Sequence, residues 1–222
     1  MLRVRRQQRH LRLLGLTGMP GYQDAAAVAG RGLAVFPLPA GSKAAGPGWQ
    51  RRCTSDPAML ARTWPDGANI GVGCRASGIV GLDLDRHDGG PDGVAVFAAL
   101  CRIYGQPWPD TLTVATPHGG KHLYFRIPPG TTAASTIGRW PGIDIRAPGY
   151  RSGGYLAGPG SVVDGAEYLI DRDIPAVPLP RWLASLLTDP GAGSVTPAPT
   201  SRPPPRRSRN RPGVPARRPR VS

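Results

Sequence analysis

Residues 79–85, Ile-Val-Gly-Leu-Asp-Leu-Asp, constrain the fold more than any other stretch of this chain. Apolar residues alternate with Gly81, Asp83 and Asp85, which indicates a β-strand with one buried face and two carboxylates on the other. At a rise of about 3.3 Å per residue, the carboxylates lie roughly 7 Å apart and, unpaired, would raise one another's pKa. A divalent cation such as Mg²⁺, which binds one or two carboxylates and substrate phosphates, would relieve this repulsion. An exposed strand with two incidental aspartates is the alternative interpretation.

Two later segments have the same division into an apolar and a polar face. In residues 122–127, His122 lies on the polar face. In residues 143–146, Asp144 and Arg146 share the polar face. If the three strands are neighbours, their polar faces gather Asp83, Asp85, Asp144, His122 and Arg146. Three carboxylates beside basic groups suit two-metal phosphoryl transfer, in which two ions about 4 Å apart stabilise the attacking and leaving oxygens.

A glycine pair and a rare lysine precede the histidine. Gly119 and Gly120 would let the backbone approach a triphosphate and offer N–H donors in a concave turn. An ordinary hairpin turn is the alternative for this pair. The chain has 26 arginines and only two lysines, Lys43 and Lys121, both in loops beside the predicted strands. Lysine binds phosphate as a compact point charge, so both are candidate nucleotide-binding residues.

The rest of the chain mixes helices and strands without a regular β-α-β repeat. Helices are predicted at residues 22–30, 56–63, 92–104 and 181–187. Further strands are predicted at residues 33–36, 69–73, 111–116, 155–157 and 167–170. We expect Pro37 to end the first of these strands, and residues 69–73 to form a hairpin with residues 79–85. The predicted fold class is α+β with a mostly antiparallel sheet.

The net charge of +14 is concentrated at the two ends of the chain. Residues 1–12 hold five arginines and residues 190–222 hold eight, with no acidic residue in either, so the chain between them carries only +1. The chain is therefore divided into a basic N-terminal extension (1–20), a central folded domain (21–188) and a tail rich in proline and arginine (189–222). The tail is expected to be disordered and to bind polyanions in a salt-dependent way.

Composition also argues against several classes of protein. No apolar run approaches the roughly 20 residues that cross a bilayer, and the basic start leads into no cleavage site, so neither a membrane span nor a signal peptide is predicted. Cys53, Cys74 and Cys101 are odd in number and widely spaced, which indicates neither a disulfide framework nor a zinc site and fits a cytoplasmic protein.

A series of motifs runs through residues 22–187. They read Gly32-Leu-Ala-Val-Phe-Pro-Leu with Lys43 and Trp49, Asn69-Ile-Gly-Val-Gly, Leu82-Asp-Leu-Asp, Gly119-Gly-Lys-His-Leu-Tyr-Phe, Ile143-Asp-Ile-Arg and Tyr155-Leu-Ala-Gly-Pro-Gly-Ser. Their order and spacing resemble the bifunctional DNA primase/polymerase N-terminal (prim-pol) domain of the archaeo-eukaryotic primase superfamily. The chain departs from the family pattern at Lys43, which lacks a proline two residues later, and at Ser161, which usually follows two prolines.

The resemblance implies that the central domain is a prim-pol catalytic domain. It implies an RNA-recognition-motif-like catalytic sheet packed with a smaller N-terminal α/β unit, and an active site between them. Asp83, Asp85 and Asp144 would bind two divalent ions, Mg²⁺ or Mn²⁺, and His122 would contact the phosphates of the incoming nucleotide. The further candidate nucleotide-binding residues are Lys43, Gly119, Gly120, Lys121, Arg146 and Ser161. The implied partners are a single-stranded DNA template and primer, nucleoside triphosphates and a separately encoded replicative helicase.

The sequence therefore favours a template-dependent nucleotidyltransferase that makes or extends primers. One alternative is a metal-dependent glycosyltransferase, since an Asp-x-Asp motif after an apolar strand also holds nucleotide-sugar diphosphates. Such enzymes usually have parallel sheets and give no reason for the two later polar strands. Another alternative is a non-catalytic DNA-binding module that retains the basic ends.

Overall fold

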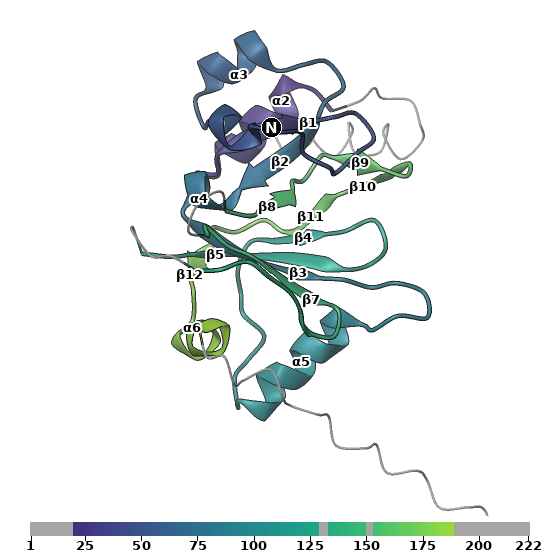
Figure 1. Ribbon diagram of the computed structural model, residues 1–222, viewed down its shortest axis with the longest axis vertical. Helices are drawn as coiled ribbons and strands as arrows, with labels where there is room; N and C mark the ends of the chain where they lie inside the picture. Colours follow the sequence, from purple (N-terminus) through teal and green to yellow (C-terminus); the bar gives the residue numbers. More distant parts are fainter. Residues whose placement is uncertain (1–19, 129–132, 150–152, 189–222) are drawn as a thin grey trace, which may run out of the picture.

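β3 (Ile79–Leu84) is the central strand of a seven-stranded sheet, paired antiparallel with β5 (Lys121–Arg126) on one side and β7 (Ile143–Arg146) on the other. The computed structural model describes residues 20–128, 133–149 and 153–188 (Figure 1). The order of this large sheet is β11-β4-β5-β3-β7-β6, with β12 added in parallel beside β5. The other strands are β4 (Thr113–Ala115), β6 (Thr136–Trp140), β11 (Leu169–Arg172) and β12 (Val177–Pro178). The prediction of an α+β fold with a mostly antiparallel sheet is confirmed.

A second, three-stranded sheet lies above the large one in Figure 1, in the order β1-β2-β8. Two of its strands, β1 (Val35–Leu38) and β2 (Asn69–Gly73), come early in the chain, whereas β8 (Tyr155–Ala157) follows β7. This small sheet is therefore built from two distant parts of the sequence. The other elements of this half of the molecule are α2 (Tyr22–Ala29), the 3₁₀-helix η1 (Trp49–Arg52), α3 (Pro57–Thr63), β9 (Val162–Val163) and β10 (Ala166–Glu167).

The large sheet has an apolar core on each of its faces. One core lies between the sheet and two helices, α5 (Gly93–Ile103) and α6 (Arg181–Thr188), at the bottom of Figure 1. Its residues from the three central strands are Val80, Leu82, Leu84, Leu123, Phe125, Ile143 and Ile145. The opposite core includes Ile79 and Tyr124 of the large sheet with Val72 and Leu156 of the small one. The alternation predicted for the three strands is therefore confirmed, but part of the face predicted to be polar is covered by this second apolar core, in which Tyr124 is fully buried.

The small sheet packs directly on β3 at Gly81. A Cβ atom at Gly81 would lie 2.1 Å from Leu156 Cδ1, so this position in the strand needs a residue without a side chain. Asp83 follows two residues later on the same face, with its side chain 18% exposed. The small sheet thus covers the polar face of β3 at Gly81, and Asp83 lies at the margin of the covered part.

The starts of two helices follow their capping signals. Asp56 accepts a hydrogen bond from the backbone N–H of Ala58 at 2.9 Å, and Pro57 takes the first position of α3. Asp92 caps α5 in the same way, accepting from the backbone N–H of Ala95 at 3.0 Å. The helices predicted at residues 56–63 and 92–104 therefore begin at the residues that cap α3 and α5.

The hairpin predicted between residues 69–73 and 79–85 is wrong. β2 belongs to the small sheet and β3 to the large one. Between them a short helix, α4 (Cys74–Ser77), ends at Gly78, which adopts the left-handed conformation with φ of 61°. Both edges of β2 are occupied by β1 and β8, and both edges of β3 by β5 and β7, so the two strands cannot pair.

Two smaller details also differ from the prediction. β1 continues through Pro37, which lies opposite Ile70, because β1 is an edge strand and the missing N–H of proline can face away from the sheet. β6, β9 and β12 have no counterpart among the predicted strands. Each is short or lacks a continuous alternation of apolar and polar residues.

The proposed extension 1–20 and tail 189–222 lie, except for Pro20, outside the described residues, so the division of the chain into these segments stays a prediction. None of the helices in the described ranges is both long and apolar enough to cross a bilayer. Cys53, Cys74 and Cys101 all carry free thiols.

Candidate active site

The strand register places three of the predicted site residues in one row. Asp83 of β3 lies directly opposite His122 of β5 on one side and directly opposite Asp144 of β7 on the other. Directly opposed residues of antiparallel strands have Cβ atoms about 4.5–5.5 Å apart, so the three side chains are neighbours. Their side chains are largely buried, with exposed fractions of 18% for Asp83, 4% for His122 and 17% for Asp144. The prediction that these strands bring their polar faces together is confirmed.

Both aspartates in this row have a basic partner. His122 Nε2 lies 3.1 Å from Asp83 Oδ1. Arg146 Nη2 donates a hydrogen bond of 2.8 Å to Asp144 Oδ2, and the backbone N–H of Gly138 donates one of 3.2 Å to Asp144 Oδ1. These contacts fix the carboxylates on the sheet and partly neutralise two charges that are held out of water.

Asp85 lies just beyond the end of β3, where two other segments hold its backbone. Its N–H donates to the carbonyl of Gly142 in the β6–β7 turn, and its carbonyl accepts from Gly93 N–H at the start of α5, both at 2.8 Å. Gly93 and Gly142 are in close contact, because a Cβ atom at Gly93 would lie 1.9 Å from Gly142 O. The position of Asp85 therefore depends on a contact between two glycines.

Asp83 is held in its ionised form. Burial on its own would raise the pKa of Asp83, but the charge and hydrogen bond of His122, together with the charges of Arg146 and Lys43, outweigh it. The pKa of Asp83 is therefore below its ordinary value, and the carboxylate is available to a cation at neutral pH.

Asp85 has the opposite shift. Burial and the negative charge of Asp83 raise its pKa, and the charge of Asp144 makes a smaller contribution in the same direction. The interactions of Asp85 with His87, whose Nε2 lies 3.8 Å from Asp85 Oδ1, and with Lys43 act against this rise. The carboxylates thus repel one another, and a cation bound near Asp85 would relieve that repulsion.

Lys43 joins this cluster from the loop between β1 and η1. Its side chain is exposed, and its charge acts on the carboxylates of both Asp83 and Asp85. The sequence placed Lys43 among the nucleotide-binding residues, and the structure brings it to the same region as the acids although 40 residues separate it from Asp83 in the chain.

The glycine pair and Lys121 lie in or beside the β4–β5 hairpin. Gly119 has a φ of 81°, and a Cβ atom at Gly120 would lie 2.4 Å from Leu84 O, so both glycines are needed for the turn and its packing on β3. Lys121 Nζ lies 2.6 Å from Asp171 Oδ2 of β11. By strand alternation Lys121 points to the opposite face of β5 from His122, so the structure does not bring it together with the acids.

Ser161 is also separate from the row of His122, Asp83 and Asp144 (the acidic row). Its side chain is fully buried, and its hydroxyl accepts from Ile70 N–H at 2.9 Å and donates to Ile70 O at 3.1 Å. These contacts connect the segment after β8 to β2. They support a structural role for Ser161 instead of the predicted contact with a nucleotide.

Tyr168 is a residue of this region that the sequence did not identify. It lies between β10 and β11, and its ring is tilted against that of His122 with centroids 5.5 Å apart. Burial and the charges of Asp83 and Asp85 raise the pKa of Tyr168 to about 12, so its hydroxyl stays protonated near the acids. The only signal for it was its position in a short predicted strand, from which the face it occupies cannot be determined.

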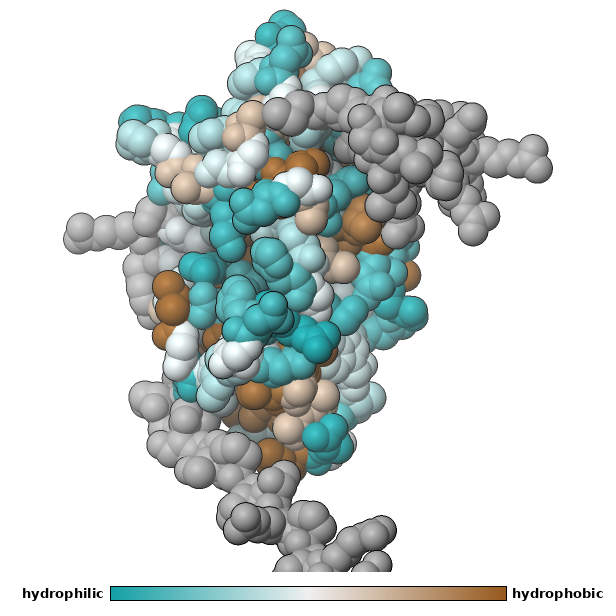
Figure 2. Space-filling model, turned by 90° about the vertical axis from the view of Figure 1, so that its right-hand side faces the viewer, coloured by the Kyte–Doolittle hydropathy of each residue, from teal (hydrophilic) through white to brown (hydrophobic). Residues whose placement is uncertain are grey.

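A polar hollow of about 770 Å³ adjoins Asp85. It is lined by Arg86, His87, Asp88, Gly89, Gly90, Asp92 and His118. These residues belong to the β3–α5 loop and the β4–β5 turn, which project from the right-hand side of the large sheet in Figure 1. Figure 2 views the molecule from that side, and hydrophilic side chains form a band across the middle of this face. The acidic row thus lies beside an open, polar surface.

The donor types in this region fit a divalent cation. Asp83, Asp85 and Asp144 offer the oxygen ligands that Mg²⁺ and Mn²⁺ prefer, and the pKa of Asp85 is raised by burial first and by the negative charges of Asp83 and Asp144 in addition. Within the described ranges, no three His, Cys, Asp or Glu side chains surround one point closely enough to hold an ion. Ligation would therefore require the carboxylates to turn from their present partners toward a common centre.

One family profile matches most of the chain. The profile of the bifunctional DNA primase/polymerase N-terminal domain matches residues 25–182, a range that contains the acidic row. No curated protein sequence matches the chain. The match supports a nucleotidyltransferase function of DNA primase/polymerase type, with DNA and nucleotides as partners and the divalent-metal dependence typical of the family. Because the profile covers well over half of the sequence, the chain belongs to the bifunctional DNA primase/polymerase N-terminal family.

Proposed function

We propose that this chain is a template-dependent nucleotidyltransferase that makes or extends primers on single-stranded DNA. The observation that supports it is the row His122–Asp83–Asp144 across three paired strands, with Asp85 at the end of the central one. This row lies within the range matched by the primase/polymerase family. The glycosyltransferase alternative loses support, because the central strands of the sheet are antiparallel.

In the proposed reaction, a primer 3′-hydroxyl or an initiating nucleotide attacks the α-phosphate of an incoming nucleotide, and pyrophosphate leaves. Asp83, Asp85 and Asp144 would hold the divalent ions. Bound there, the ions supply stabilisation of the attacking and leaving oxygens.

The basic residues around the acids would orient the triphosphate. Arg146, held by Asp144 at 2.8 Å, keeps its guanidinium on the polar face of the sheet and can offer its remaining N–H donors to phosphate. His122, whose Nε2 lies 3.1 Å from Asp83 Oδ1, and Lys43, whose charge acts on Asp83, would add further donors for phosphate. A separately encoded helicase stays a prediction from the sequence.

Primer extension and de novo synthesis on single-stranded DNA test this function. We expect incorporation with Mg²⁺ or Mn²⁺ and complete loss of incorporation when EDTA removes the ions, because three carboxylates without a cation repel the triphosphate. The assay should supply ribonucleotides and deoxyribonucleotides separately. No incorporation with either ion and either nucleotide class would reject the proposed activity.

His122→Ala is expected to weaken nucleotide binding about tenfold and to change single-stranded DNA binding less than twofold. The reason is that a charge-assisted hydrogen bond to phosphate is worth about 1.5–3 kcal/mol, whereas a template contacts many groups. Separate titrations of nucleotide and DNA, with a melting curve to confirm folding, measure the difference. Equal losses for both ligands in a folded variant would instead assign His122 a structural role.

A further inference from the structure

The backbone on both sides of Lys43 is held by side chains from the small sheet. Asn69 Nδ2 of β2 donates a hydrogen bond of 3.0 Å to the carbonyl of Ser42. The hydroxyl of Tyr155 in β8 donates to the carbonyl of Lys43 at 3.0 Å and accepts from the N–H of Ala45 at 2.9 Å. Three hydrogen bonds thus hold three residues, Ser42, Lys43 and Ala45, of a loop that lies outside any helix or strand.

Asn69 is itself fixed by its surroundings. It is fully buried, its Oδ1 accepts from Val162 N–H at 2.9 Å, and its Nδ2 also donates to Val162 O at 2.7 Å. A buried amide with partners on both ends has one allowed orientation. The hydrogen bond to Ser42 therefore starts from a rigid donor.

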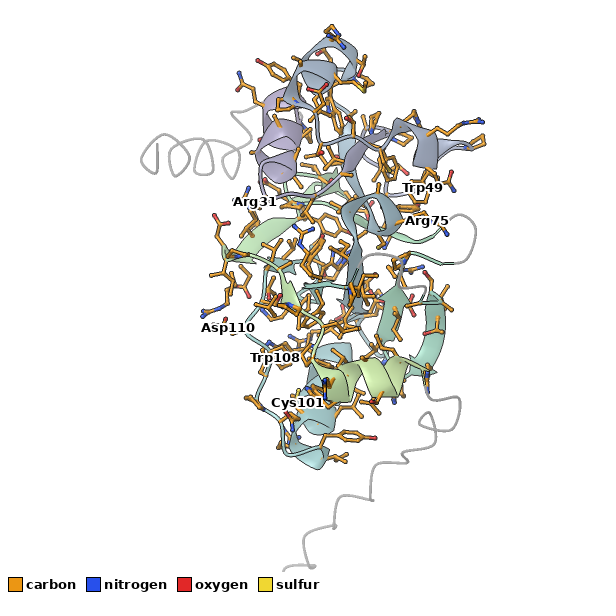
Figure 3. All side chains as sticks on the ribbon, turned by 90° about the vertical axis from the view of Figure 1, so that its left-hand side faces the viewer. Arg31, Trp49, Arg75, Cys101, Trp108 and Asp110 are labelled. Atoms are coloured by element: carbon orange, nitrogen blue, oxygen red, sulfur yellow. The ribbon has the colours of Figure 1, made fainter. Side chains whose placement is uncertain are left out.

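Tyr155 is fixed by ring packing. Its ring meets that of Trp49 edge-on with centroids 4.9 Å apart, and that of Phe36 edge-on at 5.4 Å. Phe36 and Trp49 stack on each other at 4.6 Å. Trp49 lies beside the small sheet in the upper half of the molecule (Figure 3). The packing of these three rings therefore fixes the position of the Tyr155 hydroxyl beside the loop that contains Lys43.

The side chain of Lys43 contrasts with this fixed backbone. It is exposed, and no ion pair of its ammonium occurs among the described residues. The chain's other lysine, Lys121, has its ammonium 2.6 Å from Asp171. A long side chain loses rotamer entropy when it is ordered, so a backbone that is already held in place lowers the remaining cost of binding.

We propose that Asn69 and Tyr155 are positioning residues that hold Lys43 beside the acidic row, where its ammonium binds a phosphate of the incoming nucleotide. This inference rests on the proposed function. Lys43 is the residue that contacts the substrate, and Asn69 and Tyr155 of the small sheet act only through Lys43.

Lysine acylation tests the contact without requiring catalysis, because the chain has only two lysines. The full-length protein is treated with an acylating ester, with and without deoxyadenosine triphosphate and Mg²⁺ and with no template, and modification is read by mass spectrometry. Nucleotide is expected to slow acylation of Lys43 about tenfold, because a bound phosphate shields the ammonium. Lys121, on the opposite face of β5, is the internal reference and should not change. Nucleotide binding without protection of Lys43 would overturn the inference.

Tyr155→Phe tests the positioning role, because it keeps the ring packing and removes only the hydroxyl. We expect the nucleotide KM to rise about fivefold, because both hydrogen bonds of the hydroxyl to the Lys43 loop are lost, with kcat and the melting temperature close to wild type. Tyr104→Phe, at the end of α5 beneath the large sheet, is the matched control and should change neither constant.

The double variant Lys43→Ala/Tyr155→Phe separates positioning from a merely structural effect. If Tyr155 acts through Lys43, the double variant should have the same KM as Lys43→Ala. Additive increases in KM would overturn the positioning role. If wild type incorporates no nucleotide but nucleotide still protects Lys43, the proposed function fails and the lysine contact stands, so the two failures are distinguishable.

Discussion

Asp83→Asn is expected to reduce nucleotide incorporation by ~10³-fold while the protein stays folded. Asp83 is the middle member of the row across β5, β3 and β7, and its pKa is already held below the ordinary value. An amide has nearly the same shape but carries no charge, so it holds a divalent cation much more weakly and does not balance a charge on its partners. The scale follows the losses of about 10²–10³ seen when one group that stabilises transition-state charge is removed, with the metal site lost in addition.

Asp173→Asn provides the matched control for this substitution. Asp173 is exposed and pairs with Arg31 at 2.8 Å. Arg31 lies on the face shown in Figure 3, which is the side of the molecule opposite the polar band of Figure 2. Rates of single-nucleotide incorporation and melting curves should be measured for both variants. Wild-type rates in a folded Asp83→Asn protein would show that the Asp83 carboxylate is not needed for nucleotide incorporation.

Gly93→Ala is expected to destabilise the fold by about 3 kcal/mol and to lower the melting temperature by roughly 6–12 °C. The added Cβ atom would lie 1.9 Å from Gly142 O and 3.0 Å from Asp85 N. Backbone atoms cannot rotate away as a side chain does, so α5 or the β6–β7 turn must move. Since the same contact holds Asp85, incorporation should fall in the fraction that still folds.

Gly46→Ala is the matched control, because no atom lies within 4 Å of the position its Cβ would take. Calorimetry or a thermal melt of both variants beside wild type gives the comparison. A melting temperature of Gly93→Ala within 2 °C of wild type would mean that the helix and turn separate at little cost, and Asp85 would then not depend on this contact.

The row of acids could be predicted because it depends on a local property of the sequence. Alternation in residues 79–85 determines which face each side chain occupies, whatever its neighbours are. The same alternation places His122 and Asp144 on the polar faces of their own strands. The sequence therefore left open only whether the three strands are neighbours in the sheet. The antiparallel register, with Asp83 opposite both residues, provided the answer.

The rest of the site depends on contacts between distant segments, which periodicity does not reveal. Residues 69–73 and 79–84 are both good strands separated by a short link, so a hairpin was the local prediction, yet each strand finds its partners elsewhere. Tyr168 reaches His122 from a segment 46 residues away in the chain. Ser161 looked like a ligand in its motif, but its hydroxyl is occupied by Ile70.

The late position of β8 in the chain affects the order in which this protein can fold during synthesis. β2 pairs with β8 through Val72 and Leu156, so the edge of β2 has no partner until the ribosome has added more than 80 residues beyond it. At 5–20 residues per second, that interval is roughly 4–17 s. β3, β5 and β7 are all synthesised within it, so the catalytic strands can assemble before the small sheet closes over Gly81. A nascent chain that stalls within this interval would present β2 as an unpaired edge strand, which is a site for aggregation.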